Sequence, residues 1–175
     1  MSRAYVLMNC ELGTEKKVIS ALKKTESVKE AHGTLGLYDI VAQIETDSDE
    51  EAQKIITETI RKMPKIRSTM TLTRSESGEL FQASEKLIGA MLGQNIAQAY
   101  VVIHCDKGDE FPTLKNLSKI QEVKEADVVF GLYDVICKVE APNNSILDNV
   151  LTKAIRRLPN IKSSMTLHIV NEQES

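Results

Sequence analysis

Tryptophan is absent from this 175-residue chain, and only four tyrosines and three phenylalanines supply aromatic rings. Proteins that bind single-stranded nucleic acids stack bases on aromatic side chains, so this composition argues against that class. Cysteine is also scarce, because Cys10, Cys105 and Cys137 form an odd set without a C-x-x-C pair. This pattern excludes a disulfide framework and a zinc site of the usual spacing.

Excess positive charge and long apolar runs are missing as well. The formal net charge is −3, whereas a surface that neutralises many phosphates needs a basic balance. The sequence contains no run of about 18 apolar residues, and no signal-peptide core follows Met1. We therefore expect a soluble, cytoplasmic protein with no membrane segment and no direct nucleic-acid contacts.

What the sequence does contain is a duplication. Gly36-Leu37-Tyr38-Asp39 recurs unchanged as Gly131-Leu132-Tyr133-Asp134, 95 positions later. With this offset and no gaps, about 26 of about 71 aligned pairs are identical between residues 4–74 and 99–169. Solenoid repeats are roughly 20 to 50 residues long, so a repeat of this length indicates a duplicated globular domain.

Each half alternates strand-like and helix-like segments. In the first half, residues 5–10, 28–35, 38–45 and 66–73 are rich in β-forming residues, and the apolar residues of two intervening segments have helical spacing. The second half repeats this pattern, with its last strand over 161–170. The order βαββαβ predicts an α+β fold with two ferredoxin-like domains, each a four-stranded sheet with two helices on one face.

Three segments follow from this pattern: a first ligand-binding domain over 1–74, a linker over 75–95 and a second ligand-binding domain over 96–175. A polar break opens the linker, and apolar residues at helical spacing then predict one connecting helix. Its stripe consists of Leu80, Ser84, Leu87, Ile88 and Met91.

Strand periodicity indicates how the two halves are arranged. Val6, Met8 and Cys10 share one face of the first strand and are expected to meet the helices. The opposite face begins with Tyr5 and Leu7, which is not the polar pattern of a solvated face. We therefore predict that the halves pack sheet against sheet as an internal pseudo-dimer.

The repeated Gly-Leu-Tyr-Asp motif is the best candidate for a binding site. At a hairpin tip, glycine supplies positive φ and aspartate stabilises the turn, which is a purely structural explanation of the motif. Alternatively, exposed N–H groups beside the glycine hold a carboxylate and the aspartate accepts from an ammonium group, as suits an amino acid. Hydroxyl groups of the last strand extend the set. The predicted effector-binding residues are Gly36, Tyr38, Asp39, Ser68, Thr71, Gly131, Tyr133, Asp134, Ser163 and Thr166.

Two other interpretations stay open on the residues alone. Methionine and cysteine could form a soft-metal site for copper, although burial in the core is the simpler explanation. A small barrel enzyme of monooxygenase or isomerase type would need a polar cavity, to which only His32 or His104 could contribute. No Ser-His-Asp, Cys-His, paired-carboxylate or P-loop pattern is visible, so we expect no catalytic residue, no metal and no cofactor. The sulfur set is Met8, Met63, Met70, Met165, Cys10 and Cys105.

Several landmarks together resemble the effector-binding regulatory domain (RAM domain) of the Lrp/AsnC transcription regulators. In the first half these are Val28-Lys29-Glu30-Ala31, Gly36-Leu37-Tyr38-Asp39, Met63-Pro64-Lys65-Ile66 and Ser68-Thr69-Met70-Thr71-Leu72. The second half has the same landmarks at 123–126, 131–134, 158–161 and 163–167. The resemblance covers nearly the whole chain except the linker.

The resemblance implies a dimeric α+β barrel arrangement, further assembly into rings, and amino-acid effectors bound near oligomer interfaces. It implies effector contacts from the hairpin residues Gly36, Tyr38 and Asp39 and from their copies. Family transcription factors carry an N-terminal helix-turn-helix domain, for which the sequence before Ala4 leaves no room. The implied protein is a sensing regulator that acts as a homo-oligomer or in mixed oligomers with helix-turn-helix-bearing family members, and not as an enzyme.

Overall fold

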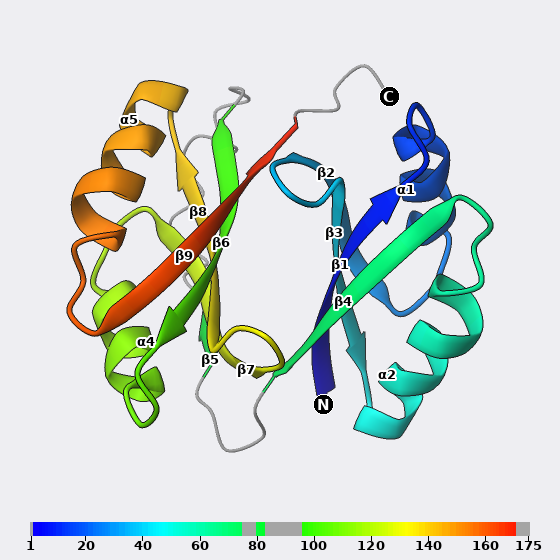
Figure 1. Ribbon diagram of the computed structural model, residues 1–175, viewed down its shortest axis with the longest axis horizontal. Helices are drawn as coiled ribbons and strands as arrows, with labels where there is room; N and C mark the ends of the chain where they lie inside the picture. The colour runs from blue at the N-terminus through cyan, green and yellow to red at the C-terminus, as the bar shows by residue number, and fades with distance from the viewer. Residues whose placement is uncertain (1, 75–79, 83–95, 171–175) are drawn as a thin grey trace. The chain divides into compact units, whose positions relative to one another are not determined.

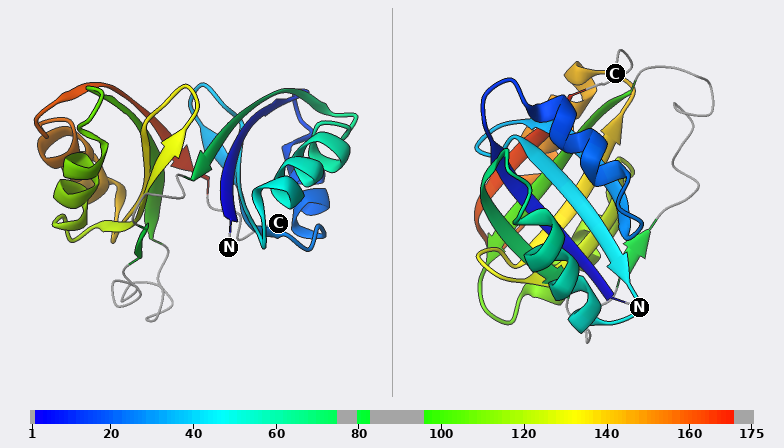
Figure 2. Two further views of the ribbon diagram at one scale, coloured as in Figure 1. Left: turned by 90° about the horizontal axis from the view of Figure 1, so that it is seen from below. Right: turned by 90° about the vertical axis from the view of Figure 1, so that its right-hand side faces the viewer.

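The computed structural model describes residues 2–74, 80–82 and 96–170. The chain divides into two compact units, Met1–Glu76 with Ile169–Ser175, and Ser77–His168. In each unit two helical segments cover one face of an antiparallel sheet (Figure 1; Figure 2). The predicted α+β fold with two ferredoxin-like halves is confirmed, while the sheet-to-sheet packing of the halves stays a prediction.

The first unit has the predicted βαββαβ order. Its strands lie in the order β4-β1-β3-β2, so the first strand is central and pairs with both β3 and β4. α2 continues directly into a π-helical turn, η1. The elements are β1 (Ser2–Cys10), α1 (Glu15–Lys23), β2 (Val28–Leu35), β3 (Ile40–Thr46), α2 (Asp49–Ile55), η1 (Ile56–Ile60) and β4 (Ile66–Arg74).

The second unit repeats this arrangement and adds one strand. The strand order is β9-β6-β8-β7-β5, and the additional strand β5 pairs antiparallel with the edge of β7. The elements are β5 (Leu80–Gln82), β6 (Ala97–Cys105), α4 (Glu110–Ser118), β7 (Val123–Phe130), β8 (Val135–Ala141), α5 (Asn144–Asn149), η3 (Val150–Ile155) and β9 (Ile161–Ile169).

Strand β5 corrects one expectation about the linker. Leu80 was assigned to the stripe of a connecting helix, but it pairs with Asp127 of β7 in a β-ladder. The edge of β7 offers backbone hydrogen bonds that a three-residue segment can use, and this outweighs a local helical pattern. The rest of that stripe, from Ser84 to Met91, lies outside the described residues.

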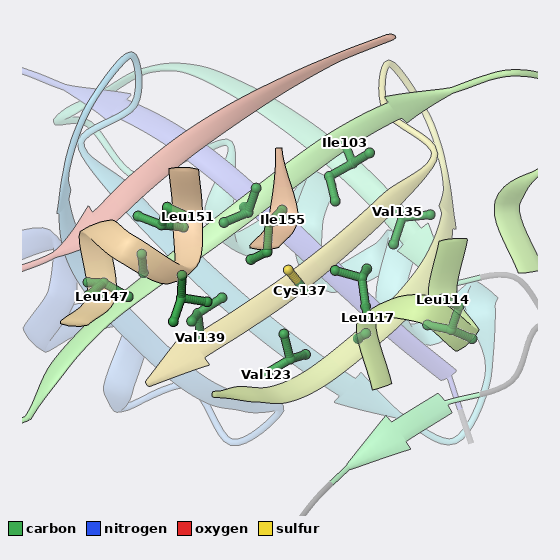
Figure 3. Close-up of a cluster of buried hydrophobic side chains, with 14 of the residues drawn as sticks. Ile103, Leu114, Leu117, Val123, Val135, Cys137, Val139, Leu147, Leu151 and Ile155 are labelled. Carbon is green, nitrogen blue, oxygen red and sulfur yellow. The ribbon is translucent and has the colours of Figure 1, made fainter. Parts of the chain in front are cut away.

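Apolar side chains between the helices and the sheet form a separate core in each unit. Val6, Met8 and Cys10 belong to the core of the first unit, as strand periodicity predicts. In the second unit Cys137 lies at the centre of the cluster, among Val139, Leu117 and Ile155 (Figure 3). Complete burial raises the pKa of the Cys137 thiol to about 12, so this sulfur serves as a small apolar group.

The sulfur atoms proposed for a copper site are split between these cores. Met8, Cys10 and Met63 belong to or pack against the core of the first unit, and Cys105 belongs to that of the second. Burial also raises the pKa of Cys10, and it raises that of Cys105 to about 11, which disfavours the thiolate that a metal requires. Within the described residues no group of three or more His, Cys, Asp or Glu side chains is placed to hold a metal.

Candidate functional site

The two Gly-Leu-Tyr-Asp motifs form the tips of the β2–β3 and β7–β8 hairpins, here called the first and second hairpins. Gly36 has φ 152° and Gly131 has φ 144°, a conformation that side chains disfavour, so the predicted need for glycine is confirmed. The neighbouring Leu37 and Leu132 are 74% and 66% exposed. The tips therefore present backbone groups and apolar side chains to solvent.

Both aspartates are anchored to the central strand of their own unit. The ladder between β1 and β4 shifts register between Asn9 and Cys10, and at this bulge the Cys10 N–H donates to Asp39 Oδ2 (3.0 Å). Asp39 is held further by its own N–H, which donates to the Met8 carbonyl (2.9 Å). The carboxylate thus satisfies a backbone donor that the bulge takes out of the regular ladder.

The second unit repeats this anchor in detail. The ladder between β6 and β9 shifts between His104 and Cys105, and the Cys105 N–H donates to Asp134 Oδ2 (3.0 Å). The Asp134 N–H donates to the Ile103 carbonyl (2.9 Å). A structural role therefore accounts for part of the repeated aspartate, but the hydrogen bonds among the described residues reach only one of the two carboxylate oxygens in each unit.

In the first unit, an asparagine faces the anchored aspartate. The Asn9 amide is oriented so that both its nitrogen and its oxygen have hydrogen-bond partners. In this orientation the amide nitrogen donates to Asp39 Oδ2 (3.3 Å) and to the Leu37 carbonyl (3.2 Å). The other end of the amide lies beside Ser68 Oγ at 3.4 Å. The structure therefore brings two predicted residues, Asp39 and Ser68, to one site through a third that was not predicted.

A second set of bonds closes the first hairpin. Thr34 Oγ1 donates to the Tyr38 carbonyl (2.8 Å), and the Tyr38 hydroxyl donates to Met70 Sδ (3.7 Å). The equivalent of Thr34 is Val129, which has no hydroxyl group to make the first of these bonds. The two hairpins therefore differ in how their tips are fastened.

In the second unit, a histidine takes the place of Asn9. The His104 Nδ1 lies 3.3 Å from Asp134 Oδ2, and because an ionised carboxylate only accepts, Nδ1 carries the proton and donates. The His104 ring also stacks on Tyr133, with centroids 4.7 Å apart and an interplanar angle of 30°. About 44% of the imidazole side chain is exposed, so the pair faces solvent.

The last strand contributes its predicted hydroxyl groups to different faces. Ser68 pairs with Asn9, and Ser163 pairs with His104, so both serines lie on the face that carries the aspartates. Thr71 pairs with the core residue Val6, and Thr166 pairs with the core residue Val101. Directly paired residues share a face, so both threonines lie on the helix side, away from the hairpin sites.

Asn9 and His104 are the residues that the sequence analysis did not assign to the site. They occupy equivalent positions near the ends of β1 and β6. The antiparallel pairing of β1 with β3, and of β6 with β8, brings these strand ends beside the hairpins. The signal that could have found them is a polar residue at the same position in both copies, directly after the apolar runs 5–8 and 100–103.

His104, Asp134 and Ser163 are the residue types of a serine hydrolase triad, an arrangement that was not visible in the sequence. They share one face, but in the described residues no hydrogen bond joins Ser163 Oγ to His104. Activation of a serine requires that bond. The described arrangement is therefore a histidine–aspartate pair beside an unactivated hydroxyl group.

Comparison with solved structures places this fold among known proteins. The chain is similar to FFRP-DM1 and to the hypothetical protein PHS023 from Pyrococcus horikoshii, each at 39% identity and TM-score 0.42 over 43% of this chain, covering 100% and 90% of those chains. The siroheme decarboxylase NirDL is similar over 97% of this chain and 71% of its own, at 8% identity and TM-score 0.67, which is a likeness of fold alone. No protein of curated function matches the chain.

None of the helices among the described residues has the length and apolar character needed to cross a bilayer. The family model of the Lrp/AsnC ligand-binding domain matches the sequence twice, over residues 3–77 and 98–174. Both matches contain a complete hairpin motif and the polar residue that faces its aspartate. The chain therefore belongs to the Lrp/AsnC family, as a tandem pair of its ligand-binding domains.

Proposed function

We propose that this protein is a non-enzymatic sensor of a small zwitterionic metabolite, an amino acid, with a binding site at each hairpin. The observation that supports this most directly is the pairing of an anchored carboxylate with a glycine tip at each site. In the described part of the chain, the N–H groups of Gly36 and Leu37 donate to no other group, and neither do those of Gly131 and Leu132.

The chemistry of the site suits the two charges of an amino acid. The free N–H groups at the tip are donors for the ligand carboxylate, and the second oxygen of Asp39 or Asp134 is an acceptor for its ammonium group. The Cys10 and Cys105 N–H groups hold the aspartates in place before a ligand arrives. Such preorganisation reduces the entropy that binding would otherwise cost.

Binding is favoured over catalysis by the groups around His104. An imidazole held by a carboxylate is a competent proton acceptor, but it needs a nucleophile or a second acid–base group positioned beside it. Ser163 is the nearest candidate by strand pairing, and it lacks a hydrogen bond to the imidazole in the described residues. A hairpin that recognises charge needs no such partner.

Sensing becomes regulation when the ligand changes what the protein binds. We propose that the protein forms homo-oligomers, as a ring of two-unit chains, and mixed oligomers with family members that carry a helix-turn-helix domain. A ligand shifts such an equilibrium only by its differential affinity for the two states. Native mass spectrometry with and without the bound amino acid measures this shift, and an unchanged distribution would remove regulation through assembly.

The binding proposal is tested by isothermal titration of the full chain with the standard L-amino acids. We expect at least one to bind, and we expect Asp39→Asn or Asp134→Asn to weaken the corresponding site by about tenfold, because each removes one charged contact. Asparagine keeps an oxygen that can accept from the Cys10 or Cys105 N–H, so the anchor survives. Urea unfolding of both variants checks this.

Two results would contradict the proposal. One is the absence of heat and of any thermal stabilisation with the whole panel. The other is an amino acid that binds equally well to the Asp39→Asn and Asp134→Asn double variant, since the ammonium contact would then lie elsewhere.

A further inference from the structure

A cavity in the first unit is lined by residues from the turn after η1 and from the start of β4. Figure 1 shows the turn that joins the helix ending in η1 to β4. Its volume is about 220 Å³, and five residues line it: Arg61, Ile66, Arg67, Ser68 and Thr69. Binding sites for drug-sized ligands are about 300 to 1,000 Å³. A space of this size suits a small ligand or one chemical group of a larger ligand.

The two arginines that line the cavity are not neutralised. In the described part of the chain neither Arg61 nor Arg67 forms an ion pair, and the nearby Glu11 lies 4.0 Å from Lys65 instead. Both arginines are exposed, so their charges are accessible. Two guanidinium groups beside two hydroxyl groups form a set made mostly of hydrogen-bond donors.

The second unit shows that this arrangement is not a fixed property of the fold. The equivalent of Arg67 is Lys162, whose Nζ lies 3.4 Å from Asp106 Oδ1. Asp106 in turn is the equivalent of Glu11, which pairs with Lys65 in the first unit. The second unit therefore neutralises the cation that the first unit leaves unpaired beside its cavity.

A helix end accounts for only part of this charge. A cation near the last turn of a helix complements the partial negative charge of its carbonyl groups, and Arg61 and Lys62 both satisfy that need. Arg67 lies on β4, so its charge is not explained by an interaction with a helix dipole. Arginine also differs from lysine in that its planar guanidinium binds carboxylate or phosphate oxygens in pairs.

We propose that the cavity lined by Arg61, Arg67, Ser68 and Thr69 is a binding site for a small oxyanion, a phosphate or carboxylate group of a metabolite, present in the first unit and not in the second. The guanidinium groups neutralise the anion, and the Ser68 hydroxyl group, which lies on the face opposite the core, donates to one of its remaining oxygens. This site adjoins the zwitterion site of the first hairpin, because Ser68 lines the cavity and also lies beside Asn9, which contacts Asp39.

The test is titration of the full chain with inorganic phosphate and, separately, with succinate, followed by calorimetry and by NMR of the arginine Nε resonances. Saturable binding that shifts Arg61 and Arg67 is the expected result, and the stronger of the two probes identifies the oxyanion. Arg67→Gln and Arg61→Gln should each weaken binding by about tenfold. The matched control is Lys162→Gln in the second unit, which should leave affinity unchanged.

Three outcomes would overturn the site. These are no binding of either probe at millimolar concentration, equal weakening by Lys162→Gln and Arg67→Gln, and binding without a shift of the two arginines. Equal weakening would mean general attraction of anions to surface cations, which also falls steeply with salt. The Asp39→Asn variant distinguishes this test from the hairpin proposal, since it removes the ammonium acceptor and leaves the arginines in place.

Discussion

The two hairpins carry the same four residues and the same aspartate anchor, but different side chains face the two aspartates. In the first unit Asn9 bridges Asp39 to the Leu37 carbonyl, and Thr34 fastens the tip. In the second unit the exposed His104 binds Asp134 and stacks on Tyr133, and the threonine is replaced by Val129. One site is closed by neutral amide and hydroxyl groups, and the other by a titratable ring.

This difference separates the structural from the functional part of the motif. The glycine and the aspartate are needed wherever the chain makes this bulge and this turn, so their repetition follows from backbone geometry. The residue opposite the aspartate is free to change, and it has changed. Differences in ligand preference between the two sites should therefore be sought at Asn9 and His104 rather than in the repeated motif.

The largest expected effect comes from removing the shared anchor. Asp39→Ala and Asp134→Ala each leave the N–H of a buried cysteine without its acceptor, and we expect each to lower the free energy of unfolding by about 2 kcal/mol. Urea unfolding followed by circular dichroism measures this. The Asp→Asn variants, which retain an oxygen, should recover most of the loss. If both alanine substitutions lower the free energy of unfolding by less than about 0.5 kcal/mol, the aspartates are not structural anchors.

A smaller effect is expected where an arginine that contacts a glutamate in one unit corresponds to a neutral glutamine in the other. The Arg3 side chain donates to Glu45 across β1 and β3, and at the equivalent place Gln98 donates to Glu140. Burial alone would raise the pKa of Glu45, but the hydrogen bond and charge of Arg3, with Lys29, hold that pKa below its usual value.

Because the folded pKa of Glu45 is lowered, its stabilising contribution is present above the ordinary pKa of about 4.5 and is lost as the pH falls through the folded value. We expect Glu45→Gln to cost about 1 kcal/mol at pH 7 and progressively less below pH 4. Urea unfolding across this range is the measurement. Glu140→Gln is the matched comparison, because Gln98 and Lys124 contact Glu140 whereas Arg3 and Lys29 contact Glu45, so the two variants differ in the contact with Arg3.

The smallest effect on stability, and the sharpest on specificity, comes from exchanging the residues opposite the aspartates. Asn9→His and His104→Asn should each change the free energy of unfolding by less than about 1 kcal/mol, because both positions are partly exposed. With a bound amino acid, we expect His104→Asn to change the affinity of the second site and not of the first, because only Asp134 is contacted by this ring. Unchanged affinity at both sites, measured by isothermal titration, would show that His104 does not contribute to ligand binding.

Periodicity was sufficient to predict the βαββαβ order of each unit and both cores, because apolar spacing in strands and helices is a local property of the sequence. Val6, Met8 and Cys10 could be placed on the helix face by alternation alone. Leu80 could not, because a short segment beside an unpaired strand edge is decided by the partner it finds. The predicted linker helix was therefore wrong at Leu80, the one residue of its apolar stripe among the described residues.

The hairpin site was predictable only in part, for a related reason. Asp39 and Ser68 could be identified by their repetition, but the link between them depends on Asn9, which is close in space and distant in sequence from both. The Cys10 and Cys105 N–H groups bind the aspartates because the ladder shifts register beside them, and a register shift cannot be predicted from the residue types alone. Thr71 shows the converse, since a repeated hydroxyl group in the last strand lies on the face away from the aspartates.

The bulge beside each hairpin also provides one spectroscopic probe, the backbone amide of Cys10 in the first unit and of Cys105 in the second. The amide protons of Cys10 and Cys105 both donate to a carboxylate oxygen, so their chemical shifts depend on that hydrogen bond. Their signals belong to different residues, so a single proton–nitrogen correlation spectrum reads the two hairpins separately. A ligand that draws on only one aspartate will move only one of these two peaks.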